Sequence, residues 1–173
     1  LRLLIAFAID TGGRLSELLG LDWRNVELNS GWVTFVQTKN GRDRTIKLCD
    51  RAIQTLMQLE PKSSGIVFTY AGKPIKSVKT AFGTACKKAS VVNFRFHDLR
   101  HTFASRLVQD GVPVYTVMHL LGHRSMTMVQ RYAHLAPEIQ DHVVRVMNGR
   151  NLGTLATSAA NDASANPLKN MVQ

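Results

Sequence analysis

The chain has 173 residues, 45% of them hydrophobic, which suits one globular domain with a sizeable core, or one domain followed by a tail. No apolar run approaches the roughly 18 residues of a membrane span, which argues against a protein with membrane-spanning helices. The 22 lysines and arginines against 12 acidic residues give a net charge of +10 and a pI near 10.1. Such an excess favours an anionic partner, either nucleic acid or an acidic membrane surface.

The N-terminal segment is predicted to form two helices separated by a glycine turn. Residues 3–9 are all apolar, as in a buried helix, and Gly12 with Gly13 ends it. A second helix begins at Arg14 and places its leucines at helical spacing through Leu19. Because the first residues already read as the middle of a helix, we expect the chain to be a piece of a longer protein.

A β-hairpin is predicted next. Residues 32–37 alternate between apolar and polar side chains, as a half-buried strand does, and residues 45–48 form a second such run. Asn40-Gly41 between the two runs is a strong signal for a tight hairpin turn.

The middle of the chain is predicted to continue with a helix, a short strand and another helix. Asp50 is expected to cap the helix that ends near Met57. Residues 66–68 are apolar and read as the strand. The helix over residues 78–89 is expected to turn three side chains inward, which are Ala81, Phe82 and Ala85.

From His97 onward the apolar spacing is helical. The helices are expected to span residues 99–108, 114–121, 126–132 and 137–147. The fold class is therefore mainly α with a small antiparallel sheet (α+β). After Gly149 the composition changes to Ala, Asn, Ser and Thr without apolar periodicity. We expect a domain over residues 1–148 and a flexible tail over 149–173, ordered by a partner protomer if at all.

The candidate chemistry centres on Tyr132, which follows His123 by nine residues. Upstream, Arg100 follows His97 by three residues, so both are expected on one helical face. A hydroxyl nucleophile near arginine and histidine is what attack on a phosphodiester requires. A phenol with a free pKa near 10 is a poor nucleophile, and we expect neighbouring cations to favour the phenolate.

Two further cations occupy exposed turns. Arg14 opens its helix after the glycine turn, where its guanidinium can meet a phosphate with two donors. Lys39 stands at the hairpin tip, a place suited to reaching a DNA backbone. His123 follows Gly122 at a helix end, where the break in the backbone can aim the imidazole into a cleft.

Five motifs in this order resemble the catalytic domain of the tyrosine recombinases of the phage integrase family, over residues 1–148. They are Thr11-Gly12-Gly13-Arg14-Leu15-Ser16-Glu17-Leu18, Thr38-Lys39-Asn40-Gly41, His97-Asp98-Leu99-Arg100-His101-Thr102-Phe103-Ala104, Leu120-Leu121-Gly122-His123 and Arg131-Tyr132-Ala133-His134. The resemblance implies a cytoplasmic enzyme of a mobile element or phage that integrates or excises DNA. It also implies double-stranded DNA as partner, a tetramer on that DNA, and accessory DNA-bending proteins.

The same resemblance implies a role for each candidate residue. The scissile phosphate would be held by Arg14 and Arg100, and Lys39 would be the general acid to the departing 5′ oxygen. The remaining roles are acid/base or proton shuttle for His97, and a hydrogen bond to the phosphate from His123. Tyr132 would form a 3′-phosphotyrosyl bond that retains the bond energy, so religation would need no ATP, metal or other cofactor.

The sequence departs from the family pattern at three places. Lys47 stands where proline is frequent, which makes it a rival to Lys39, and His119 stands where glutamate or glutamine is usual. The N-terminal DNA-clamping domain and the start of the catalytic domain are expected to be missing.

Simpler interpretations remain open for single residues. Arg14 could only pair with Glu17 on a solvated helix, and Lys39 could be an ordinary charge in a loop. The four-residue spacing of His97 and His101, or of His119 and His123, is also that of helical zinc ligands. The remaining histidines are assigned to structural or surface positions, and these are His101, His134 and His142.

Two alternative functions also remain open. The first is a helical DNA-binding module whose basic residues only bind phosphate. The second is a type IB topoisomerase with the same chemistry.

Overall fold

The computed structural model describes residues 1–36, 43–123, 125, 127–135, 144 and 147. The chain divides into two compact units, Leu1–Leu135 and Ala136–Gln173, and nearly all of the described residues belong to the first. In the described ranges, no helix combines the length and the apolarity that crossing a membrane demands.

Helix α1 (Arg2–Thr11) forms the centre of the first unit. Its residues Leu4, Phe7, Ala8 and Thr11 are buried, at the three- and four-residue spacing of one helical face. The helix ends at Gly12, which adopts a left-handed φ of 60° and donates its N–H to the carbonyl of Ala8. A Cβ at this position would lie 2.5 Å from the ring of Phe103, so the turn needs glycine for both space and conformation.

The predicted hairpin is part of a three-stranded antiparallel sheet. Its strands are β1 (Val26–Glu27), β2 (Trp32–Phe35) and β3 (Arg44–Lys47), in the order β1-β2-β3. The pairing of β2 with β3 confirms the hairpin, and its expected turn at residues 40–41 lies outside the described ranges. Along β2 and β3 every second side chain is buried, and these are Val33, Phe35, Arg44 and Ile46.

Two short helices precede this sheet and two longer ones follow it. The first two are α2 (Leu15–Leu19) and the 3-10 helix η1 (Trp23–Asn25). The later two are α3 (Asp50–Met57), whose N-cap residue is Cys49 and not Asp50 as predicted, and α4 (Lys79–Lys88). Phe82 of α4 is buried as expected, whereas Ala81 is exposed, so that part of the inward face was wrong.

The predicted strand over residues 66–68 is not formed. Ile66 makes only an isolated bridge to Asp22, and the apolar side chains of Val67 and Phe68 are buried in the core instead. The strands in this region are β4 (Thr69–Tyr70) and β5 (Lys73–Pro74), which pair with each other. Apolar runs of three residues do not separate a strand from a buried loop, because core burial alone accounts for them.

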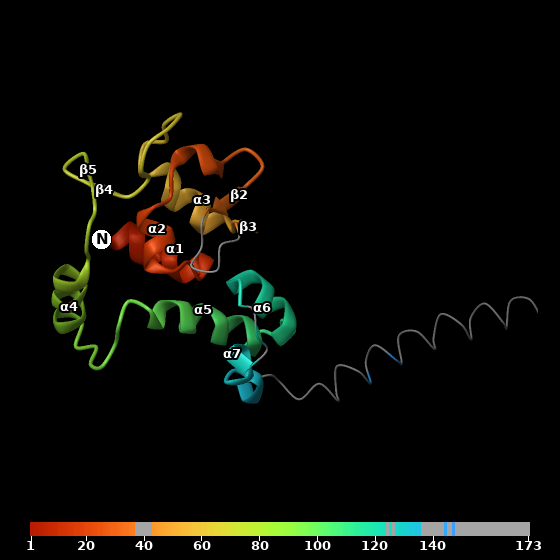
Figure 1. Cartoon of the computed structure of the whole chain (residues 1–173). Helices are drawn as coiled ribbons and strands as arrows, with labels where there is room; N and C mark the ends of the chain where they lie inside the picture. Colours follow the sequence, from red (N-terminus) through yellow and green to blue (C-terminus); the bar gives the residue numbers. More distant parts are fainter. Residues whose placement is uncertain (37–42, 124, 126, 136–143, 145–146, 148–173) are drawn as a thin grey trace, which may run out of the picture. The chain divides into compact units, whose positions relative to one another are not determined.

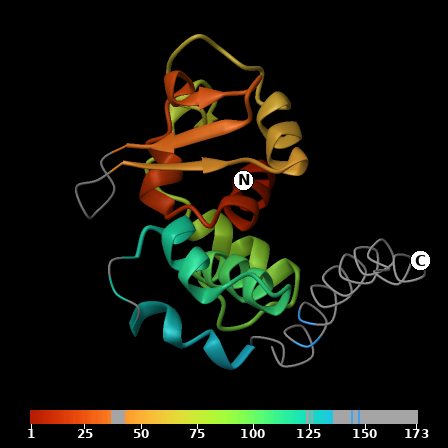
Figure 2. The same cartoon turned by 90° about the vertical axis from the view of Figure 1, so that its right-hand side faces the viewer.

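The helices after residue 97 confirm the expected helical C-terminal part up to Leu135. They are α5 (Asp98–Gln109), α6 (Val114–Leu121), the one-turn α7 (Thr127–Gln130) and the 3-10 helix η2 (Ala133–Leu135). Helix α1 contacts α3 on one side and α5 on the other, which places it between the sheet layer and the helices that carry the basic motifs (Figures 1 and 2). The helix expected over residues 137–147 and the expected tail lie outside the described ranges.

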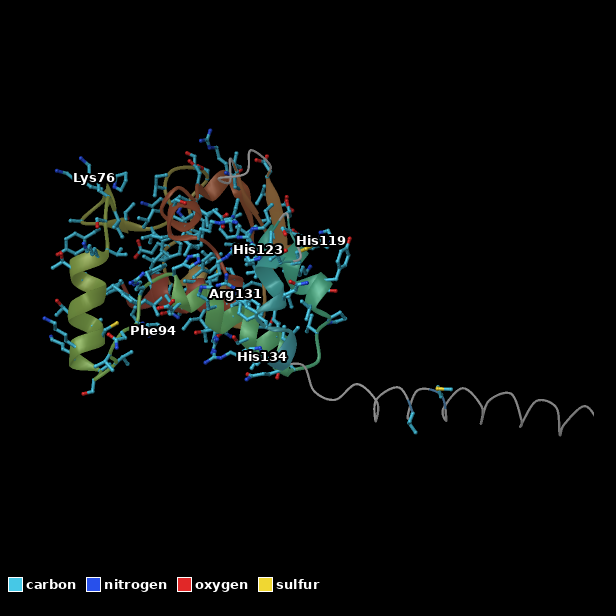
Figure 3. All side chains as sticks on the ribbon, turned by 60° about the horizontal axis from the view of Figure 1, so that its bottom comes forward. Lys76, Phe94, His119, His123, Arg131 and His134 are labelled. Atoms are coloured by element: carbon cyan, nitrogen blue, oxygen red, sulfur yellow. The ribbon has the colours of Figure 1, made fainter. Side chains whose placement is uncertain are left out.

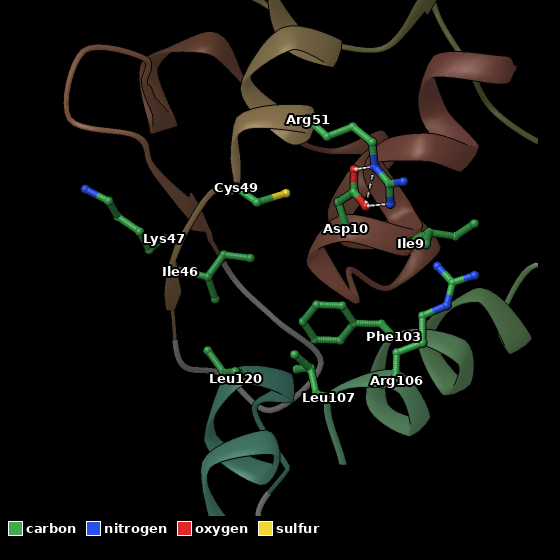
Figure 4. A pocket seen from close by; sticks show the side chains of 10 residues that line it. All are labelled: Ile9, Asp10, Ile46, Lys47, Cys49, Arg51, Phe103, Arg106, Leu107 and Leu120. Atoms are coloured by element: carbon green, nitrogen blue, oxygen red, sulfur yellow. Dashed lines mark hydrogen bonds and ion pairs between the residues drawn. The ribbon is translucent and has the colours of Figure 1, made fainter. Parts of the chain in front are cut away.

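A cavity of about 330 Å³ opens between α1, β3 and α5 (Figure 4). Its floor is apolar, with Ile9, Phe103 and Leu107, and the ion pair of Asp10 with Arg51 stands at its rim. Lys47, the rival to Lys39, lines it, but none of the described residues with a proposed catalytic role does, and these are Arg14, His97, Arg100, His123 and Tyr132. The cavity is therefore separate from the basic site described next.

Candidate active site

Arg100 joins two helix ends at the centre of the site. Its side chain is buried, its Nη1 donates to the carbonyl of Gly12 at 2.6 Å, and its Nη2 donates to the carbonyl of Leu121. Gly12 caps α1 and Leu121 is the last residue of α6, so one guanidinium holds both termini together. Burial and the charges of Arg14 and Arg44 lower the pKa of Arg100 to about 9, which leaves it cationic at neutral pH.

Arg14 is held by the carboxylate of Glu17. The backbone N–H of Arg14 donates to Oε2 of Glu17 at 2.9 Å, and its Nη1 donates to Oε1 at 2.5 Å. The same carboxylate accepts a 2.6 Å bond from Nη2 of Arg44. Burial raises the pKa of Glu17, but the charge of Arg44 and the bonds from both arginines bring it below its ordinary value. The simple Arg14–Glu17 pairing therefore exists, and it fixes the guanidinium of Arg14 rather than leaving it on a solvated surface.

Arg44 is a buried cation that the sequence analysis missed. Besides Glu17, its Nη1 donates to the carbonyl of Leu120 at 2.5 Å, and its guanidinium carbon lies 4.5 Å from the ring centre of Phe35. Its Nε is buried without a hydrogen-bond partner among the described residues. The strand alternation carried the signal, because Arg44 occupies the same inward-facing register as Ile46 on β3.

His123 follows the left-handed turn at Gly122, as its position after a helix end predicted. Its backbone N–H donates to the carbonyl of Met118, while its ring Nδ1 is buried and has no hydrogen-bond partner in the part of the chain that the structure describes. Burial and the charges of Arg100 and Arg14 lower the pKa of His123 to about 4. At neutral pH this is an uncharged imidazole that can offer an N–H to an anion. The charge of Arg131, which is labelled with His123 in Figure 3, lowers this pKa further.

Tyr132 is buried, with its hydroxyl in a hydrogen bond with Nδ1 of His101. The two ring centres lie 5.9 Å apart. Burial raises the pKa of Tyr132, although the charges of Arg131 and Arg100 act in the opposite direction. The cations therefore favour the phenolate, as expected, but desolvation of the phenol outweighs them.

His97 and His101 lie on one face at the start of α5. Their ring centres are 5.0 Å apart in an edge-to-face arrangement, with His97 at the N-cap position and exposed. Burial, then the charges of His101 and Arg100, lower the pKa of His97. The sequence pattern placed His101 among structural or surface histidines and did not reveal its contact with Tyr132. Its spacing of four residues from His97 was the available signal, and it pointed only to zinc.

The structure brings five of the six candidate residues into one electrostatic environment. The charges of Arg14 and Arg100 both act on His97 and on His123, and that of Arg100 also acts on Tyr132. Both guanidinium groups therefore belong to the same site.

Of the remaining candidates, Lys39 lies outside the described ranges. Its rival Lys47 donates from Nζ to the carbonyl of Ser30 and lies 5.1 Å from the ring centre of Trp32, which places it on the sheet. His119 is exposed, with its ring centre 4.5 Å from that of Tyr115. Among the described residues, no group of three or more His, Cys, Asp or Glu side chains could hold a metal ion.

Comparison with known proteins gives consistent matches along the chain. The sequence profile of the phage integrase family matches residues 1–138. The integrase of Salmonella phage P22 is 35% identical over 153 residues, which cover 79% of this chain and 40% of that protein. The catalytic domain of the bacteriophage HP1 integrase has a similar structure, with a TM-score of 0.66, 28% identity and coverage of 99% of this chain and 84% of that one.

A third relative shows the same fold at lower identity. The Tn1549 transposon integrase, solved in complex with circular intermediate DNA, gives a TM-score of 0.69 at 20% identity, covering 82% of this chain and 58% of that one. The chain thus spans less than half the length of the P22 integrase, and the family match includes every described candidate residue. The chain therefore belongs to the phage integrase family of tyrosine recombinases.

Proposed function

We propose that this chain is the catalytic part of a site-specific DNA recombinase, which cuts and rejoins double-stranded DNA through a 3′-phosphotyrosyl bond to Tyr132. The observation that carries the proposal is that Arg100 bonds to the carbonyls of Gly12 and Leu121, two residues before Arg14 and two before His123, while its charge acts on the Tyr132 phenol. The net charge of +10 supports a polyanionic substrate. The Tn1549 integrase, which has the same fold, was solved on DNA.

The two arginines and His123 are assigned to the scissile phosphate. Arg100 donates one hydrogen bond from Nη1 and one from Nη2 to the helix ends. A guanidinium carries five N–H groups, so further donors can bind a phosphate oxygen. Arg14 is oriented by Glu17, and His123 is neutral with a ring nitrogen that has no partner among the described residues. Fixed donors of this kind stabilise the charge that builds on the non-bridging oxygens during attack.

The remaining roles concern the attacking oxygen of Tyr132 and the departing 5′ oxygen. Tyr132 attacks the phosphorus, the bond to the 5′ oxygen breaks, and Lys39 supplies the proton that this oxygen needs. His97 is assigned to acid/base chemistry or to a proton shuttle. The phosphotyrosyl ester keeps the energy of the broken bond, so a new 5′-hydroxyl can displace the tyrosine without ATP.

The wider setting follows from the relatives and is proposed with the function. The P22 relative points to integration or excision of a phage or another mobile element, in the cytoplasm of the host cell. Exchange of two strands between two DNA sites requires four active sites, which supports a tetramer on DNA, with accessory bending proteins where a site needs them. We also propose that residues 1–148 form the catalytic domain and that the tail over 149–173 becomes ordered against a neighbouring protomer.

Covalent trapping on a randomised pool tests the function and identifies the target sequence in one experiment. Nicked duplexes with a randomised central sequence are incubated with the chain, and DNA that is bound to protein after denaturation is recovered and sequenced. The chain is expected to trap a defined sequence. Tyr132→Phe should abolish trapping, because it removes the attacking oxygen, and should retain salt-sensitive binding to the recovered duplex.

The outcomes separate the alternative functions. Binding that is lost with salt but never gives a covalent product would identify a phosphate-binding module instead. Relaxation of plasmids that lack the recovered sequence would favour a topoisomerase. Tyr132→Phe should keep its unfolding free energy within about 1 kcal/mol of the parent, since it loses one hydrogen bond. Tyr115→Phe, at an exposed tyrosine, is the matched control and should trap DNA like the parent.

A further inference from the structure

His101 is the group that the Tyr132 hydroxyl contacts. The two residues are 31 positions apart in the chain, and the hydrogen bond between Nδ1 of His101 and the phenol joins α5 to the segment between α7 and η2. His101 is half-buried beside this bond, and the ring of His97 packs edge-on against it. The contact is part of a packed cluster of three rings rather than a chance approach of two surface side chains.

The charges around the pair define its protonation state. Burial and the charge of Arg131 lower the pKa of His101, with Asp98 opposing and Arg100 assisting. Burial raises the pKa of Tyr132. At neutral pH the imidazole is therefore uncharged and the phenol keeps its proton. A neutral imidazole has one acceptor nitrogen, and the protonated phenol is the donor that fits it.

We infer that His101 is the general base that takes the proton from Tyr132 as the phenol attacks the phosphate. This inference rests on the proposed function and adds a residue to its mechanism. In the forward step the Tyr132 oxygen forms a bond to phosphorus while its proton moves to Nδ1 of His101. The bond from phosphorus to the 5′ oxygen breaks, and that oxygen is protonated by the acid assigned to Lys39. In religation the incoming 5′-hydroxyl loses its proton to that acid's conjugate base, and His101 returns its proton to the departing tyrosine.

His97 is the other histidine to consider for this task. It is exposed and packs against the ring of His101, and the structure gives it no hydrogen bond to the phenol. Its placement suits a residue that buttresses His101 or passes the proton on to solvent. The pair thus offers matched variants, because His97→Gln and His101→Gln make the same chemical change four residues apart on one helix.

The first test needs no DNA. Nitrogen NMR of the chain, labelled at histidine, distinguishes the two neutral tautomers of His101. Protonation at Nε2, with Nδ1 bare, is expected, and the His101 signals should shift in Tyr132→Phe. Protonation at Nδ1 would make the imidazole the donor and would overturn the inference, whatever the chain does with DNA.

The second test measures single-turnover cleavage of the recovered duplex across pH. His101→Gln can still accept a hydrogen bond but cannot carry the proton away, so its rate at neutral pH should fall by about 100-fold or more. The deficit should shrink as the pH approaches the ionisation of the phenol. The charged groups facing His101 are Asp98, Arg100 and Arg131, and the titratable ones are His97, His123 and Tyr132; all of them are unchanged in this variant.

A duplex with sulfur in place of the 5′ bridging oxygen completes the design, because a thiolate leaves without a proton. This duplex should restore the cleavage rate of Lys39→Ala and leave the cleavage rate of His101→Gln low. Restored cleavage by His101→Gln on the sulfur duplex, a His101→Gln rate within threefold of the parent, or a larger pH-dependent deficit in His97→Gln than in His101→Gln would each overturn the inference. If the parent chain itself cleaves nothing, the proposed function fails, while the tautomer result still decides the state of the pair.

Discussion

The two sides of the site are held in different ways. On the arginine side, Arg14, Arg44 and Arg100 are tied to a shared carboxylate and to main-chain carbonyls of α1 and α6. On the other side, Tyr132 lies between a single helical turn and a short 3-10 helix, with its hydroxyl on His101. The phosphate-binding groups are thus part of the folded core, whereas the nucleophile depends on a few local contacts. Changes on the arginine side should cost stability, and changes at Tyr132 should cost only chemistry.

The sharpest way to break this contrast is Arg44→Met. The substitution keeps the apolar length of the side chain but leaves Glu17 buried with one cation and the Leu120 carbonyl without its donor. Removing one partner of a buried ion pair costs about 3 to 5 kcal/mol, and we expect a loss of that size in the unfolding free energy, measured by urea titration.

The matched control for this change is Arg24→Met. Arg24 also pairs with a carboxylate, that of Asp22, but its side chain is 71% exposed. A surface pair contributes little to stability, so the control should stay close to the parent. Equal losses in the two variants would show that the arginine side is no more tightly held than the surface.

Gly12→Ala should have the next largest effect. The left-handed φ of 60° disfavours alanine, and the new Cβ would come within 2.5 Å of the Phe103 ring. Strain and overpacking together are expected to cost roughly 2 to 4 kcal/mol. Gly111→Ala has a similarly positive φ of 85° with nothing within 4 Å, so it isolates the strain and should cost only about 1 to 2 kcal/mol. If Gly12→Ala lowers the unfolding free energy no more than Gly111→Ala does, the Phe103 ring moves aside without measurable cost.

The last expected effect is a pH dependence from His123, which is spread over more than two pH units. Its pKa is about 4 in the folded chain against an ordinary 6.5, so the unfolded chain binds more protons between these values. The unfolding free energy should therefore fall as the pH drops from 6.5 towards 4, and this contribution should level off below 4. His123→Gln should flatten that part of the profile. Direct titration of the His123 ring by NMR checks the cause, and a midpoint above 6 would contradict it.

Much of the fold could be predicted from local patterns. The apolar spacing predicted α1, α5 and α6 because each helix buries a regular face, and strand alternation predicted β2 and β3. The strand over residues 66–68 was wrong because a short apolar run is equally compatible with a buried loop. Pairing partners far apart in sequence decide such segments, and a local pattern does not contain them.

The residues of the candidate site likewise fall into those that local patterns predict and those that depend on contacts between distant parts of the chain. Arg14, Arg100 and His123 could be placed from turns and helix ends, which are local features. The contacts made by Arg44 and His101 join residues 27 and 31 positions apart, and these became visible only in the folded chain. The raised pKa of Tyr132 was missed for a related reason, since burial of the phenol depends on how distant helices pack around it.

The two bonds from Arg100 to helix ends have a consequence for how charge is distributed. The C-terminal end of a helix carries roughly half a negative charge, spread over its unpaired carbonyls. Gly12 and Leu121 offer Arg100 two such ends, so the guanidinium is compensated by peptide dipoles and needs no acidic side chain of its own. Dipoles cannot titrate or swing away as a carboxylate can. The attraction that Arg100 exerts on an incoming anion is thereby set largely by the backbone, and it should vary little from mildly acidic to neutral solution, well below its pKa of about 9.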